Sequence, residues 1–284
     1  MRIGIDFPTV LVGAALILTC TAGALGSARA GGTSRDRAGD ALLRAEIAER
    51  GWVSLPSPGA AGSPASPAST QGVDLMCATR PFSLHLGNGV VEGDPASPLA
   101  LARATRIVDS ELARYAPDLL HRAGLGRVLF TATLREGGRA IPSLPNCAGT
   151  LLLDVDAPEA FLRRLVHHEV FHFIDLADDG VVRHDPRWES LNERFFVYGD
   201  GGRSTRDPRG ATLTDTLPGF LNAYSLSGVE EDKAEVFSFL MTSPREVERI
   251  AKDDVVLTNK TVLLREQLAH LAGASPSPLP PPAK

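Results

Sequence analysis

One pentapeptide constrains this chain of 284 residues more than any other feature: His168-Glu169-Val170-Phe171-His172. Apolar residues recur around it at helical spacing, which predicts a helix over residues 157–176. Four residues advance an α-helix by about 400° and about 6 Å, so the two histidines share one face and lie one turn apart. Two imidazoles in this arrangement are typical ligands of one zinc ion.

The residues beside these two histidines have separate predicted roles. Glu169 is rotated by about 100° from His168, so its carboxylate lies beside the metal, where it can take a proton from a water molecule as general base. Asp175 is interpreted in two ways, as an acceptor that orients an imidazole or as a solvated aspartate at the helix end. His167 points away from the ligand face and is predicted to be a packing or surface histidine. The remaining histidines have no ligand spacing to one another and are predicted to be structural or exposed: His85, His121, His184 and His270.

A catalytic zinc site requires a third protein ligand and an open coordination position. Ser227 and Glu230 have the spacing of a capping box at the start of a helix over residues 228–242, and this box would bind Glu230 to the backbone. Glu231 would then be free in the first turn, where the helix dipole favours an anion, and Glu235 would share its face. We therefore predict Glu231 as the third ligand. The alternative is an ordinary solvated acidic run.

The order of the expected elements indicates the fold class. Strands come first and most helices come late, which predicts an α+β fold with a small sheet and a mainly helical C-terminal part. Asp156 and Glu159 have the spacing of a capping box that would start the helix of the pentapeptide. The expected strands cover residues 82–86, 127–134 and 149–155, and the other expected helices cover residues 98–123, 228–242, 244–252 and 259–271.

The N-terminus has the pattern of a targeting segment. Arg2, an apolar run over residues 10–25 and an A-x-A site predict a cleavable signal peptide over residues 1–30, and therefore export. An uncleaved anchor is less favoured, because the apolar run is shorter than the roughly 20 residues of a membrane-spanning helix. A lipoprotein acylated at Cys20 is the other alternative.

Composition also sets the predicted domain boundaries. Pro/Ser/Ala-rich sequence predicts a flexible leader over residues 31–72 and a disordered Pro-rich tail over residues 273–284, which leaves residues 73–272 as the folded domain. Signal cleavage would leave Cys77 and Cys147, which predicts one disulfide, with two buried free thiols as the alternative. The net charge of −5 gives no basic excess, so nucleic acid is not an expected partner.

The surroundings of Glu231 extend the motif. Tyr224 precedes Glu231 by seven residues, and Glu231 opens the pattern Glu-x-x-Ala-Glu-x-Phe. Together with His-Glu-x-x-His, this arrangement resembles the catalytic domain of the anthrax lethal factor and Pro-Pro endopeptidase group, and bacterial zinc-binding metallopeptidases related to it. The resemblance covers about residues 150–241. It implies a gluzincin-like zincin fold in which Glu231 completes the zinc ligands, Glu235 supports them and Tyr224 stabilises the oxyanion.

Two further features bear on this resemblance. The segment from Trp188 to Tyr198 also resembles a sequence feature of that family, although it has no evident role in the chemistry. Asp232 and Lys233 stand where the relatives often carry aromatic residues, and this difference changes the packing to be expected around the third ligand.

The resemblance implies an exported endopeptidase with one zinc ion as cofactor and Glu169 as the base. Its partner would be a peptide or protein substrate, which would add as a strand to an edge strand over residues 149–155. One alternative is an exported zinc-binding protein that recognises a peptide or a wall component without cutting it. Another is a lipoprotein anchored at Cys20 whose motif is accidental. No membrane span is expected after signal cleavage.

Overall fold

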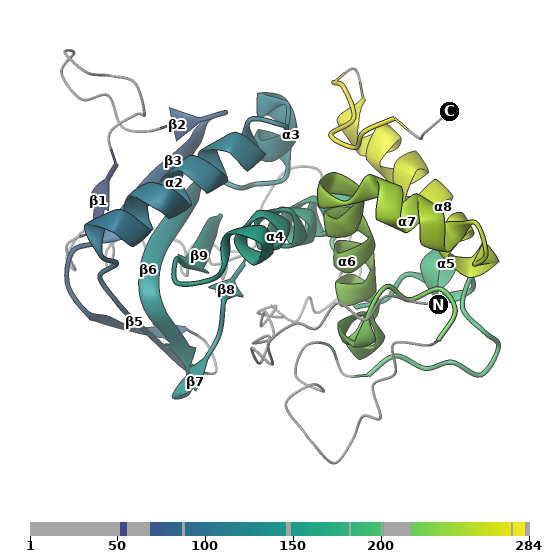
Figure 1. The fold of residues 1–284 in the computed structure, drawn as a ribbon, viewed down its shortest axis with the longest axis horizontal. Coiled ribbons are helices and arrows are strands. Elements are labelled where there is room, and N and C mark those ends of the chain that lie inside the picture. The colour runs from purple at the N-terminus through teal and green to yellow at the C-terminus, as the bar shows by residue number, and fades with distance from the viewer. Residues whose placement is uncertain are drawn as a thin grey trace, which may run out of the picture.

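The computed structural model describes residues 52–55, 69–86, 89–145, 149–181, 183–199, 201, 217–273 and 275–281. The predicted signal peptide, Cys20 and Cys147 lie outside these residues, so export and the lipid anchor stay predictions. Within them, no helix combines the length and the apolar character needed to cross a membrane. The described part of the chain is α+β, as predicted, with one mixed sheet packed against helices (Figure 1).

Strand β6 is the centre of the sheet. Its first half pairs in parallel with β3 and β9, and its second half pairs antiparallel with β5 and β7. The change occurs near Thr133, which has a φ of 51°, and β5 shifts register between Glu92 and Asp94. A register shift of this kind, as at a β-bulge, bends a strand and increases its twist. The strands are β1 (Trp52–Ser54), β2 (Ser69–Thr70), β3 (Val73–Ala78), β4 (Phe82–Leu86), β5 (Gly89–Asp94), β6 (Arg127–Glu136), β7 (Arg139–Ala140), β8 (Ser143–Leu144) and β9 (Thr150–Asp154).

The helix that carries the pentapeptide, α4, lies between the sheet and the other C-terminal helices. Helix α2 packs beside α4 over the sheet, while α6, α7 and α8 lie on the side of α4 away from the sheet (Figure 1). One apolar core joins these layers through Ile107 of α2, Phe130 of β6, Val170 of α4 and Phe237 of α6. The helices are α2 (Pro98–Leu112), α3 (Pro117–Arg122), α4 (Glu159–Asp179), α5 (Pro186–Glu189), the 3-10 helix η2 (Ala223–Ser227), α6 (Val229–Thr242), α7 (Pro244–Ala251) and α8 (Val255–Ala272).

One predicted helix is in fact two. The helix expected over residues 98–123 ends at Leu112, and α3 starts at Pro117. Ala116 between them is extended, with a ψ of 137°. The ring of the following proline disfavours helical geometry at the residue before it, which explains the break.

The predicted capping box at the start of α4 is wrong. The helix begins at Glu159, because Pro158 before it is extended, with a ψ of 147°, and no side chain caps the helix. Glu159 forms an ion pair of 2.8 Å with Arg163 one turn later instead of reaching back to Asp156. The helix nevertheless covers the pentapeptide, so the predicted placement of its histidines on one face is kept.

Strand β9 is not an edge strand, which corrects the prediction for residues 149–155. It pairs with β6 on one side and with β8 on the other, where Ser143 lies opposite Leu153 and Leu144 lies opposite Leu152. The backbone of Leu152 and Leu153 in β9 is therefore already paired on both sides, and a peptide cannot add as a strand there.

The folded domain is wider than predicted at both ends. Strand β1 falls in the predicted leader, yet it pairs with β3, and the buried ring of Trp52 lies 4.7 Å from that of Phe82 between centroids. In the predicted disordered tail, Leu279 is 6% exposed and belongs to the main core, and the carbonyl oxygen of Pro280 accepts a hydrogen bond of 2.8 Å from Arg265. Isolated apolar residues in Pro-rich sequence produce no periodicity, so composition does not reveal them.

Cys77 lies in β3 as a buried free thiol, and burial raises its pKa. A free thiol here matches the alternative to the predicted disulfide. Its expected partner Cys147 lies outside the described residues.

The packing of the tail predicts a loss of stability when Leu279 is truncated. Leu279→Ala removes a buried side chain from the main core and is expected to lower the free energy of unfolding by about 2–5 kcal/mol. Leu99→Ala is the matched control, because Leu99 is 83% exposed, and it should change this free energy by less than about 0.5 kcal/mol. Urea denaturation followed by circular dichroism measures both variants, and equal values would contradict the packing of the tail.

Candidate metal centre

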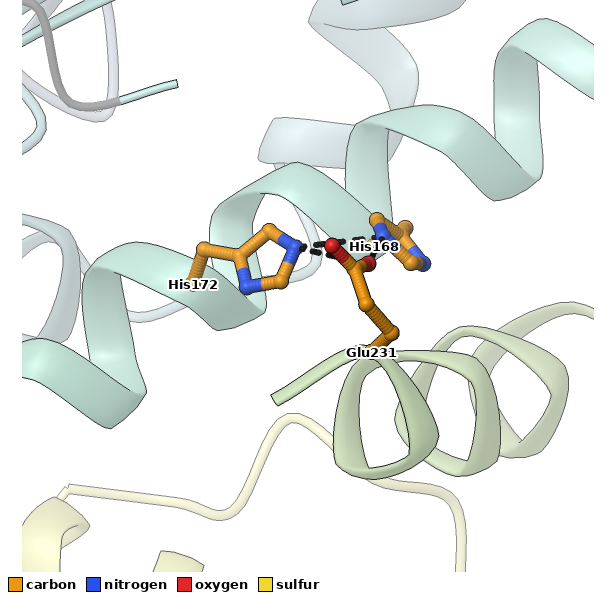
Figure 2. Close-up of side chains that lie close together, drawn as sticks. All are labelled: His168, His172 and Glu231. Atoms are coloured by element: carbon orange, nitrogen blue, oxygen red, sulfur yellow. Dashed lines mark hydrogen bonds and ion pairs between the residues drawn. The ribbon is translucent and has the colours of Figure 1, made fainter. Parts of the chain in front are cut away.

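Helices α4 and α6 bring three potential ligands to one point. His168 and His172 project from α4, and Glu231 projects from the first turn of α6 (Figure 2). The two Nε2 atoms lie 3.1 Å apart, and Oε2 of Glu231 lies 3.0 Å from Nε2 of His168 and 3.5 Å from Nε2 of His172. All three side chains are buried. In the described part of the chain, this is the one group of histidine, cysteine and acidic residues with the spacing of a metal site.

The spacing and the donor atoms fit one zinc ion. Ligand atoms at the usual zinc distances of about 2.0–2.1 Å in a tetrahedral site lie about 3.3 Å from one another, close to the separations here. Oε1 of Glu231 is buried and has no hydrogen-bond partner among the described residues. Burial lowers the pKa of His168, but the adjacent carboxylates of Glu231 and Glu235 outweigh burial and raise the pKa to about 10. The surrounding carboxylates thus favour a positive charge at this point.

The position of Glu231 follows from where α6 begins. The helix has Gly228 as its N-cap, one residue later than the predicted capping box requires, and no side chain caps it. The predicted box of Ser227 and Glu230 is therefore wrong. The Ser227 hydroxyl instead donates a hydrogen bond of 2.6 Å to the carbonyl oxygen of Tyr224. Glu231 still lies in the first turn, where the helix dipole favours a carboxylate.

Glu235 lies behind the ligands, against the ring of His168, as predicted. Its Oε1 is 2.9 Å from Nδ1 of His168, the ring nitrogen that does not face Glu231. Its Oε2 forms an ion pair of 2.7 Å with Arg164 and accepts a hydrogen bond from Asn222. The contact with Nδ1 is at an ion-pair distance rather than an aligned hydrogen bond, and a carboxylate beside Nδ1 leaves Nε2 available to a metal.

Glu169 is buried on α4 beside the ligands. Its Oε1 accepts a hydrogen bond of 2.7 Å from the hydroxyl of Ser143, while its Oε2 has no hydrogen-bond partner among the described residues. Burial raises the pKa of Glu169, against the lowering effect of His168 and His172. A carboxylate with one free oxygen next to the ligands has the geometry of a general base. Ser143 was not predicted, because a two-residue strand carries no periodicity and no motif.

Tyr224 reaches the same site from η2. Its ring centroid lies 5.9 Å from that of His168. Burial and the charges of Glu231 and Glu169 raise the pKa of Tyr224 well above its usual value. The hydroxyl therefore keeps its proton at neutral pH and acts as a hydrogen-bond donor.

Asp175 has neither of the two arrangements predicted for it. It is buried and forms an ion pair with Lys233 of α6, whose Nζ also lies 3.0 Å from Asp185. Oδ2 of Asp175 and Nδ1 of His172 have no hydrogen-bond partner among the described residues, so Asp175 does not orient that imidazole. Burial raises the pKa of Asp175 to about 6, against the lowering effect of Lys233.

The segment from Trp188 to Tyr198 has a structural role that the sequence did not reveal. Asp232, next to Glu231, is fully buried, and its Oδ2 is the acceptor for both ends of this segment. The indole nitrogen of Trp188 donates at 2.8 Å, the Tyr198 hydroxyl at 2.6 Å, and Nζ of Lys260 at 2.7 Å. Since these three groups fix Asp232, they also fix the start of α6 from which the predicted ligand projects.

The other histidines lie away from the ligand atoms, as predicted. His167 is a packing histidine: its Nδ1 lies 2.6 Å from the Tyr115 hydroxyl, and its Nε2 lies 2.9 Å from Glu111 and 3.1 Å from Arg114. Burial lowers the pKa of His167. The other four are exposed: His85, His121, His184 and His270.

No protein-family model, curated protein or solved structure matches this chain.

The buried ion pair between Lys260 and Asp232 of α6 predicts a large loss of stability when Lys260 is replaced. Lys260→Met removes the cation that faces Asp232 and leaves a buried carboxylate uncompensated, so the free energy of unfolding is expected to fall by about 3–5 kcal/mol. Lys252→Met replaces an exposed lysine and should change the free energy of unfolding by less than about 0.5 kcal/mol. Urea denaturation compares the two, and a loss below about 1 kcal/mol for Lys260→Met, typical of a surface pair, would show that this pair does not hold the helix.

Proposed function

We propose that this protein is an exported zinc endopeptidase with a zincin-like fold. The observation that carries the proposal is the convergence of His168, His172 and Glu231, with Glu169 and Tyr224 beside them. Binding a metal requires the three ligands but neither a buried base nor a protonated phenol next to them. The proposed substrate is a peptide or protein, and the sequence pattern of residues 1–30 supports export.

The mechanism assigns a role to each residue around the ligands. When bound, zinc supplies a Lewis acid that polarises a carbonyl and lowers the pKa of a water molecule. Glu169 accepts the proton of the attacking water on its free Oε2 and passes it to the leaving amine. The Tyr224 hydroxyl donates a hydrogen bond to the carbonyl oxygen as negative charge develops there. The carboxylate of Glu235 beside Nδ1 of His168 leaves Nε2 available to the metal.

The proposal predicts one zinc ion per chain and cleavage that depends on Glu169. Glu169→Gln should retain zinc and lower kcat/KM by about 10²–10⁴-fold, because only the base is lost. His168→Ala should lose the ion, whereas His121→Ala, at an exposed position, should keep both metal and activity. Elemental analysis of the purified protein and mass spectrometry of a digested peptide library measure the two properties.

The same experiment separates the two candidate functions. Zinc retention with equal cleavage by wild type and Glu169→Gln would reject the proposed mechanism. Stoichiometric zinc without cleavage by any variant would instead favour an exported zinc-binding protein that recognises a peptide or a wall component without cutting it.

A second prediction concerns the phenol. Tyr224→Phe keeps the ring beside His168 and removes only the hydroxyl, so kcat should fall by about 10²–10³-fold while zinc content stays the same. Steady-state kinetics on a peptide found in the library screen measures this change. A kcat equal to that of the wild type would mean that Tyr224 is a packing residue.

A further inference from the structure

A two-residue strand brings one hydroxyl to the catalytic side of α4. Strand β8 pairs antiparallel with β9, with Ser143 opposite Leu153 and Leu144 opposite Leu152. Side chains alternate between the two faces of a strand, and directly opposed residues share a face. Leu144 and Leu152 belong to the small core, while Leu153 belongs to the main core with α4. Ser143 therefore points from the sheet toward α4.

The backbone of β8 is restricted on both sides. Pro142 and Pro145 flank the two residues, and a proline ring fixes its own φ and removes a backbone donor. The carbonyl oxygen of Pro142 accepts a hydrogen bond of 2.9 Å from the backbone N–H of Asp154. Pairing with β9 and the two prolines thus hold the Cα atom of Ser143 in one place.

The hydroxyl of Ser143 meets one oxygen of Glu169 in the interior of the protein. Oγ lies 2.7 Å from Oε1, and both residues are buried. A hydroxyl that donates to an ionised carboxylate forms a charge-assisted hydrogen bond, which is stronger and more directional than a neutral one. The second oxygen, Oε2, is buried and has no hydrogen-bond partner among the described residues. Oε1 of Glu169 is thus hydrogen-bonded, while Oε2 can accept a proton.

We propose that Ser143 is a positioning residue for Glu169, and that its hydroxyl fixes the carboxylate so that Oε2 faces the attacking water. This inference rests on the proposed peptidase function. It differs from a space-filling role, because alanine occupies nearly the same volume as serine but lacks the hydroxyl. A positioning role therefore predicts an effect on turnover that packing alone does not.

The test compares three variants of the full chain, each loaded with zinc. Ser143→Ala should lower kcat about tenfold, equivalent to about 1.4 kcal/mol in the activation free energy, with KM and zinc content unchanged. Ser143→Thr keeps the hydroxyl and should recover most of this loss. Thr105→Val is the control, because it removes a buried hydroxyl on α2 that donates to the carbonyl oxygen of Leu101, and its kcat should equal that of the wild type.

A second readout does not depend on turnover. The antisymmetric carboxylate stretch of Glu169 is isolated as the infrared difference between the wild type and Glu169→Gln. Loss of the hydrogen bond should shift this band in Ser143→Ala but not in Thr105→Val.

The outcomes distinguish this inference from the proposed function. A kcat of Ser143→Ala within about twofold of the wild type overturns the positioning role, and an unshifted band overturns the contact itself. A reduced kcat, a shifted band and recovery in Ser143→Thr together support it. If the zinc-loaded wild type cleaves no peptide, the peptidase proposal fails and the positioning role fails with it, whereas a shifted band would still show that the hydroxyl binds Glu169.

Discussion

The packing of α6 depends on the positive groups that lie next to three consecutive buried acids, Glu230, Glu231 and Asp232. A carboxylate in the protein interior is costly unless it is paired and hydrogen-bonded. Glu230 lies 4.0 Å from Arg183, and Asp232 lies 2.7 Å from Lys260. Glu231, between them, faces two imidazoles, which carry positive charge only when they are protonated. A divalent cation at this point would supply the charge without protons, and its binding would then stabilise the docking of α6 on α4.

Ionic contacts between α4 and α6 also set how the two helices align. Glu231 and Glu235 contact opposite ring nitrogens of His168, and Lys233 pairs with Asp175 two turns further along α4. A shift of one helix along the other would separate all of these charges at once, and each separated charge would remain buried. This arrangement explains why the acidic run of residues 230–232 is buried rather than exposed to solvent.

Local geometry made part of this site predictable from sequence. Two histidines four residues apart on a helix share a face in any fold, and the structure confirms this arrangement. The prediction of Glu231 came from a capping box that does not form and from the family resemblance. The contacts that hold the start of α6 are distant in sequence: Trp188 and Lys260 lie 44 and 28 residues from Asp232. Both predicted capping boxes failed because the helices begin later than the box spacing requires. Ser143 carries no motif, and only its pairing with β9 reveals that it faces Glu169.

Anomalous diffraction at the zinc absorption edge, from crystals of the zinc-loaded full chain, tests the central claim most directly. A single strong peak is predicted between the Nε2 atoms of His168 and His172 and the carboxylate of Glu231. Zinc bound at another position, or no peak between these residues with Glu231 turned to solvent, would contradict the account.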